Sequence, residues 1–155
     1  MPYPRRRLRF ASLAGVLPEV ERLSVMPYRR VGQWNLAQIC AHLAGAFELS
    51  MNGFGKPAPR GMRALAGKLI LRVVLFSHRI PTGRPLAQEH IPPAETDPVE
   101  AISRLRAAIG RFAAHTGPLA MHPLFGRMSA EKWTAFHLVH CGHHLSFLVP
   151  EEKSV

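Results

Sequence analysis

Histidine is the residue type in this chain whose number and spacing could support chemistry. The sequence contains nine histidines, and four of them fall between positions 137 and 144. His140 and His144 are one helical turn apart, so on a helix their imidazoles reach the same point in space, as in metal-binding helices. The alternative is a pair of core histidines bonded to backbone groups or water. Two ligands from one helix cannot complete a metal site, so a second helix must supply a third.

The candidate for a third ligand is His42, which lies in the stretch from Trp34 to Leu43. The apolar stripe of this region is formed by Leu36, Ile39, Leu43 and Phe47. At about 100° per residue, His42 falls about 100° from the centre of the stripe and therefore at its edge. An edge position can point toward a neighbouring helix or belong to a second layer of the core. The residue pattern alone leaves both interpretations of His42 open.

Two further histidines share the last helix with His140 and His144. His137 and His143 lie about 60° to either side of His140. We interpret His137 as a hydrogen-bond partner of a ligand or as a fourth ligand, and His143 as structural. The scattered histidines fall at helix ends and in loops, where solvated histidines are ordinary; they are His78, His90, His115 and His122.

Other catalytic patterns do not stand out. Cys40 and Cys141 are interpreted as small buried residues and not as ligands. We find no nucleophilic Ser/His/Asp arrangement and no phosphate-binding glycine loop in the sequence. The sequence therefore assigns candidate metal ligands, while catalytic and cofactor-binding residues stay unknown.

Helical patterns dominate the chain and predict an all-α fold without strands. The predicted helices are 12–24, with Ser12 as a cap, then about 36–52, 61–79, 98–115 and 130–148. Asn35 and Gln38 form a capping box before the second helix. Asp97 and Ser129 cap the fourth and fifth helices, and the fourth carries Pro98 at its first position. A proline-rich loop separates the third helix, which is strongly basic, from the fourth.

Length and composition bound the class of protein. A chain of 155 residues with 47% hydrophobic residues predicts one domain over 1–155, with 1–8 as a basic, flexible arm. Two cysteines are too few for a disulfide scaffold and favour a reducing compartment. We expect neither an export signal nor a transmembrane segment, and a cytoplasmic location follows.

The net charge of +10 is unevenly distributed. Between Glu48 and Glu89 every charged residue is basic, from Lys56 to Arg84. Such a face suits phosphate, an acidic small molecule or an anionic membrane surface, and a merely solubilising face is the leading interpretation. No nucleic-acid motif accompanies the charge, so specific nucleic-acid binding is not expected.

The chain from about Leu8 to Leu148 resembles the DinB/YfiT-like superfamily of metalloenzymes, and within it a branch of unknown function. Two passages carry the resemblance: Trp34 to Gly53, with the core Gln38-Ile39-Cys40-Ala41-His42-Leu43, and His122-Pro123-Leu124-Phe125-Gly126 running through Trp133 into the histidine helix. The resemblance implies a DinB-like four-helix bundle, here with an additional basic helix and a proline-rich loop. It also implies a metal site on His42, His140 and His144.

The sequence departs from the superfamily pattern after the last ligand. Many members follow that histidine with Arg-Gly-Gln, whereas Leu145-Ser146-Phe147 follow His144 here. This difference affects any substrate group held by the usual glutamine and leaves the metal ligands unchanged.

The expected function rests on the charge and coordination of such a site. Three neutral imidazoles would leave a divalent ion, Zn, Ni or Fe, with its full charge and an open position. The resemblance implies an enzyme that acts on a small-molecule substrate, such as a transferase or isomerase that uses a low-molecular-weight thiol, and it implies a homodimer. The alternatives are a metal-assisted hydrolase and a non-catalytic metal-binding or stress-related protein whose basic surface docks a partner.

Overall fold

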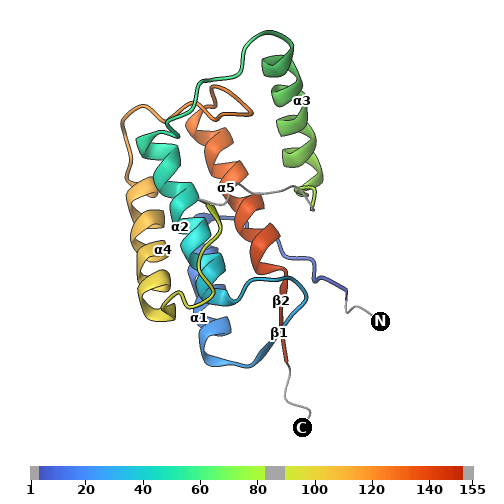
Figure 1. Cartoon of the computed structure of the whole chain (residues 1–155), viewed down its shortest axis with the longest axis vertical. Coiled ribbons are helices and arrows are strands. Elements are labelled where there is room, and N and C mark those ends of the chain that lie inside the picture. The colour runs from blue at the N-terminus through green and yellow to red at the C-terminus, as the bar shows by residue number, and fades with distance from the viewer. Residues whose placement is uncertain (1–3, 83–89, 152–155) are drawn as a thin grey trace.

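The computed structural model describes residues 4–82 and 90–151 and shows a mostly helical chain with a small sheet (Figure 1). The elements in chain order are η1 (Leu13–Gly15), α1 (Val16–Val25), β1 (Tyr28–Arg30), α2 (Leu36–Asn52), α3 (Gly61–Ser77), α4 (Pro98–Ala113), α5 (Ala130–Leu145) and β2 (Leu148–Pro150). The five predicted helices are confirmed, and the prediction that the chain has no strands is wrong. The predicted proline-rich loop falls in part on residues 83–89, outside the described residues.

Side-chain caps fix where three of the helices begin. The Asn35 side chain accepts a hydrogen bond from the Gln38 N–H at 2.9 Å, and the Gln38 side chain accepts one from the Asn35 N–H at 3.0 Å. The predicted capping box is therefore confirmed. Asp97 accepts from the Glu100 N–H at 2.8 Å, and Ser129 starts α5 in the same way. These caps satisfy N–H groups that have no partner within the helix.

Several predicted helix boundaries are corrected by the structure. The third helix ends at Ser77, because His78 adopts a left-handed conformation with φ of 52°. The fourth ends at Ala113, two residues earlier than predicted. Ser12 precedes the short η1 and makes no side-chain cap bond, so α1 itself begins at Val16.

The last helix ends at Leu145 because the chain then pairs with an earlier segment. β2 lies antiparallel to β1, with Tyr28 opposite Pro150 and Arg30 opposite Leu148. Pro150 disfavours a helical conformation in the residue before it, and pairing with β1 gives this segment's backbone groups partners. The Val31 N–H also donates to the Phe147 carbonyl at 2.9 Å. This pairing holds the beginning of α2 beside the end of α5.

The core lies where α2 packs against α4 on one side and α5 on the other, with α1 behind them (Figure 1). Leu43 and Phe47 of α2 and Leu105 of α4 are completely buried at this centre. The spacing of Leu43 and Phe47 makes α2 apolar along the face toward α4, and these two helices form the most extensive helix–helix contact of the described residues. The edge of the same apolar stripe of α2 faces α5.

The N-terminal segment contacts α1 and α5 at Arg6 and Leu8, and residues 1–3 of the predicted flexible arm lie outside the described residues. The Arg6 guanidinium donates to the Glu19 carboxylate at 2.5 Å and to the Leu145 carbonyl at 3.2 Å. Gly142 allows this approach, because a Cβ there would lie 2.7 Å from the Leu8 carbonyl oxygen. In the described ranges, no helix is long and apolar enough to cross a membrane.

Candidate metal centre

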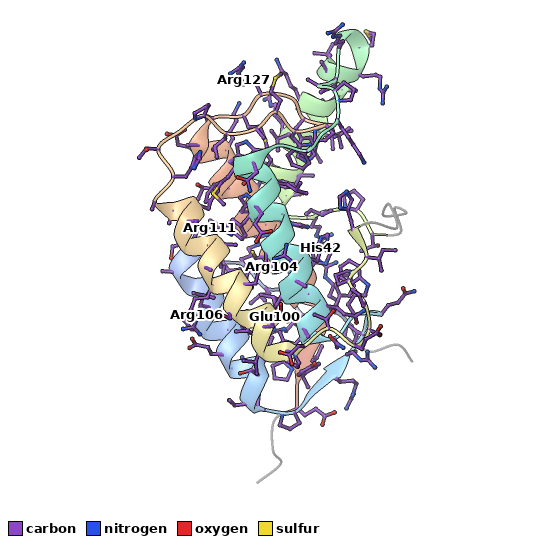
Figure 2. The ribbon with its side chains drawn as sticks, turned by 60° about the vertical axis from the view of Figure 1, so that its left-hand side comes forward. His42, Glu100, Arg104, Arg106, Arg111 and Arg127 are labelled. Atoms are coloured by element: carbon purple, nitrogen blue, oxygen red, sulfur yellow. The ribbon has the colours of Figure 1, made fainter. Side chains whose placement is uncertain are left out.

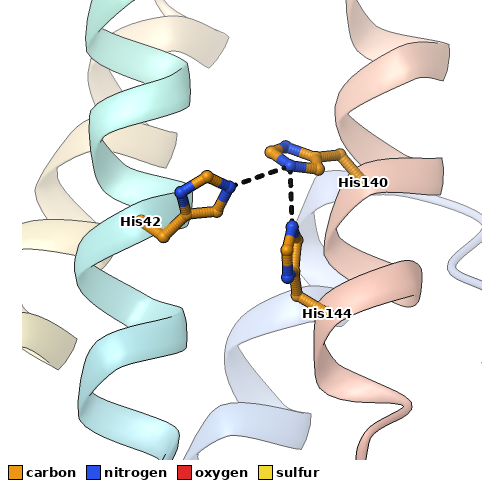
Figure 3. Close-up of side chains that lie close together, drawn as sticks. All are labelled: His42, His140 and His144. Carbon is orange, nitrogen blue, oxygen red and sulfur yellow. Dashed lines mark hydrogen bonds between the residues drawn. The ribbon is translucent and has the colours of Figure 1, made fainter. Parts of the chain in front are cut away.

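Three histidines from two helices meet between α2 and α5. His42 comes from α2 (Figure 2). His140 and His144 come from successive turns of α5 (Figure 3). The His140 Nε2 lies 3.2 Å from the His42 Nε2 and 3.0 Å from the His144 Nε2. One ring nitrogen from each residue lies within 4.8 Å of the other two. The structure therefore brings the three sequence-predicted ligands into one group that could hold a metal ion.

Hydrogen bonding alone does not account for this arrangement of nitrogens. The His42 Nδ1–H donates to the His90 carbonyl at 3.4 Å, and because a carbonyl only accepts, that tautomer leaves the His42 Nε2 with a lone pair. The His140 Nε2 carries either one hydrogen or one lone pair, so it cannot make a linear hydrogen bond to both neighbours. A cation between the rings would instead accept three lone pairs.

The spacing of the nitrogens also fits a small ion. Imidazole nitrogens about 2.0–2.1 Å from a tetrahedral zinc lie about 3.3 Å from one another. Two of the three separations, 3.2 Å between His42 and His140 and 3.0 Å between His140 and His144, are close to that value. The third pair, His42 and His144, also lies within 4.8 Å, so the three nitrogens are close enough together to hold a divalent ion.

The three rings are held in the neutral form that binds a metal. Burial keeps the pKa values of His140 and His144 well below the usual range, and the neighbouring histidines lower these pKa values further. Burial also lowers the pKa of His42, although the hydrogen bond to the His90 carbonyl opposes that shift. At neutral pH the group therefore presents uncharged imidazoles.

Aromatic side chains fix the orientation of the rings. Trp34 stacks on His144 with ring centres 5.4 Å apart and tilts against His42 at 5.0 Å. Phe136 stacks on His140 at 5.6 Å. These contacts restrict rotation of the imidazoles, and they surround the nitrogens with apolar surface that strengthens electrostatic interactions.

The histidine group lies on the wall of a large cleft and is not sealed in the core. The cleft has a volume of about 1460 Å³ and runs along α2, and its lining includes all three histidines. Trp34, Ile91 and Phe147 line it beside them, and each histidine side chain is only partly buried. A ligand of an ion held there would therefore have room on the cleft side.

His137 is not part of the group. Its ring stacks on Phe47 at 3.9 Å and its Nε2 lies 3.1 Å from the Ser50 Oγ, on the side of α5 that faces the core. The Ser50 hydroxyl donates to the Phe47 carbonyl at 2.7 Å, so the His137 Nε2–H must be the donor to Ser50. Burial lowers the pKa of His137 to about 3, and His122 adds to the shift.

His143 and the cysteines lie apart from the three nitrogens. The His143 ring contacts the edge of the His144 ring and packs on Phe147. Cys40 and Cys141 are buried free thiols, as predicted, and burial raises the pKa of the Cys40 thiol to about 12. Neither cysteine belongs to the group of described residues that could hold a metal.

One of the scattered histidines, His122, differs from the sequence prediction. His122 is half-buried and its Nδ1 accepts the backbone N–H groups of Leu124 and Phe125 at 3.0 and 3.1 Å. Burial lowers the pKa of His122 to about 4, so it is not an ordinary solvated histidine. His90 contributes through its carbonyl, and no residue type signals a backbone contact of this kind. The proximity of Trp34 to His42 could have been anticipated from the sequence, because Trp34 directly precedes Asn35, the cap of the helix that carries His42.

Comparisons with known proteins match this sequence to one family. A family model described as "Protein of unknown function (DUF1569)" matches residues 3–151. No curated protein and no solved structure matches the chain. The match spans nearly the whole chain and includes all three histidines of the group. This chain therefore belongs to the DUF1569 family.

Proposed function

We propose that this protein is a metal-dependent enzyme that holds a divalent ion on His42, His140 and His144. The observation that carries the proposal is the meeting of three neutral imidazole nitrogens at the wall of a cleft. A purely structural ion is normally enclosed by four protein ligands, whereas a catalytic ion keeps a position for substrate. We further propose a DinB-like four-helix bundle as the fold in which the site is built, and a cytoplasmic location.

The residues around the site have separate tasks in this proposal. His140 and His144 provide two ligands from one helix face, and His42 links them to α2. The His90 carbonyl selects the tautomer of His42 that leaves the Nε2 lone pair toward the group. Trp34 and Phe136 limit the movement of the rings and exclude water from one side.

The charge at the site favours an anionic fourth ligand. Three imidazoles carry no charge, and the described residues that can form the metal group include no carboxylate. A divalent ion bound there would act as a Lewis acid and lower the pKa of a thiol or water that ligates it. Because the surrounding side chains are apolar, a thiolate is a better ligand here than a neutral water molecule.

The proposed activity is therefore a transferase or isomerase reaction in which a low-molecular-weight thiol binds at the open position beside a small-molecule substrate. The cleft is large enough for both, since drug-sized ligands occupy pockets of about 300–1,000 Å³ and this one measures about 1460 Å³. Metal-assisted hydrolysis would use the same open position for water.

The first test is elemental analysis of protein purified without added metal. We expect about one equivalent of Zn, Ni or Fe per chain. Cobalt substitution followed by titration with cellular thiols should then produce a sulfur-to-cobalt charge-transfer band. The His140→Ala variant, treated identically, should show neither bound cobalt nor the band. Cobalt binding without a spectral response to any thiol would replace the transferase proposal by hydrolysis.

A further inference from the structure

Helix α3 carries a second apolar stripe on the side away from the rest of the protein. Five large apolar side chains are 58–91% exposed along it: Met62, Leu65, Leu69, Val73 and Phe76. At about 100° per residue these positions fall within an arc of about 80°. The opposite side, with Gly67, Leu71 and Val74, is buried. Scattered exposed apolar residues are normal, but a continuous stripe of five marks an interaction surface.

The position of α3 leaves this stripe accessible. Figure 1 shows α3 at the side of the molecule next to α5, and its inner face packs on α5 and on the loop at Leu124. The stripe extends over 14 residue steps, or about 21 Å of helix. It is therefore long enough to lie flat on an extended apolar surface.

Basic side chains border the stripe on both flanks. Arg72 and Lys68 lie about 80° and 120° to one side of Met62, and Arg63 lies about 100° to the other side. All three are exposed, and no acidic residue occurs in α3. An exposed apolar stripe between basic flanks is the pattern of a helix that rests in the interface of an anionic bilayer.

A second copy of the chain fits this surface less well. Pairing two α3 stripes would bring the basic flanks of both copies together without an acidic side chain on either helix. Lipid phosphates supply the negative charge that the flanks lack, and acyl chains cover the apolar stripe. We propose that α3 docks this protein on the surface of an anionic lipid bilayer, with the stripe in the interface and the flanks among the headgroups.

The experiment is co-sedimentation of the full chain with vesicles of phosphatidylcholine alone or mixed with phosphatidylglycerol. We expect binding to the mixed vesicles and at least about ten-fold weaker binding to the neutral ones. Lys68→Gln with Arg72→Gln should weaken binding by about 25-fold, from about five-fold per charge. Leu69→Gln with Val73→Gln should weaken it by at least ten-fold without a change of charge. Each residue is exposed, so these variants should fold.

The matched control is Val99→Gln, which replaces an apolar residue that is 79% exposed on α4. It should bind the mixed vesicles like the unmodified protein. Three results would overturn the proposal: no binding to either vesicle, equal binding by the Leu69/Val73 variant, or a dimer in solution that the same variant converts to monomer without any vesicle binding. Cobalt binding by each variant verifies that the histidine group is intact.

Discussion

The role of His42 can be tested by comparing two histidine-to-alanine variants. His42→Ala removes the one candidate ligand that comes from α2, and leaves an i, i+4 pair on α5 that cannot complete a site. His143→Ala removes a neighbouring imidazole on α5 whose nitrogens lie outside the three-nitrogen group. We expect the first variant to lose stoichiometric metal binding and the second to retain it.

The size of the effect follows from linkage between binding and folding. A ligand present at one hundred times its dissociation constant stabilises the folded state by about 2.7 kcal/mol. For a chain of this size each kcal/mol shifts the melting temperature by about 2–4 °C. Metal should therefore raise the melting temperature of the unmodified protein and of His143→Ala by about 5–10 °C, and that of His42→Ala by about zero.

The assay is differential scanning calorimetry with and without metal, together with isothermal titration to count sites. The metal-dependent shift is the quantity to compare, because either substitution also changes packing in the absence of metal. A full shift and one bound equivalent in His42→Ala would refute the assignment of the third ligand. Loss of both in His143→Ala would show that the group extends beyond the three nitrogens.

Three other predictions concern the structure around the site. His122→Asn should flatten the rise of the free energy of unfolding with pH. Burial lowers the pKa of His122 to about 4, so between pH 4 and about 6.5 the unfolded chain binds one more proton than the folded chain. In that window the variant should lower the slope of the unfolding free energy against pH, measured by urea unfolding, by about 1.4 kcal/mol per pH unit. An unchanged slope would show that His122 is not the group that takes up this proton on unfolding. Gly67→Ala should loosen the packing of α3, because the new Cβ would lie 1.9 Å from the Leu124 carbonyl oxygen. We expect the free energy of unfolding to fall by about 1–3 kcal/mol and the amides of α3 to exchange faster, and unchanged exchange rates would contradict this. Ser50→Ala should lower the free energy of unfolding by about 1–3 kcal/mol, because it leaves the His137 Nε2–H without its acceptor. Metal binding should be unchanged, and an unaltered urea midpoint would show that this hydrogen bond does not contribute to stability.

The part of the site that lies within one helix could be predicted from the sequence. The i, i+4 spacing of His140 and His144 fixes their relative position as soon as α5 forms, and the Ser129 cap and Pro150 mark the region in which it does. The position of His42 could not be predicted in the same way, because helical periodicity places it only at the edge of an apolar stripe. Which helix packs against that edge depends on tertiary contacts, and the resemblance to a known superfamily supplied what the local pattern lacked.

Features built from distant segments could not be predicted. β1 and β2 have three residues each, too few for an alternation pattern, and Tyr28 finds its partner Pro150 more than a hundred residues away. The loop position of His122 predicts a solvated side chain. Its burial comes from the loop turning back, where His122 and Gly126 bridge to one another and Phe125 stacks on the imidazole.

The strand pair also explains how two helices so far apart in sequence bring the candidate ligands to one point. Helical residues rise about 1.5 Å each, so a slip of α2 along α5 by one residue would exceed the tolerance of about 0.2 Å for metal–ligand distances. The capping box at Asn35, seven residues before His42, fixes where α2 begins. The register of β1 with β2 fixes the end of α5 just beyond His144. Because both fixed points lie at the same end of the helix pair, the axial positions of the candidate ligands depend on the side-chain cap of α2 and on the backbone hydrogen bonds between β1 and β2.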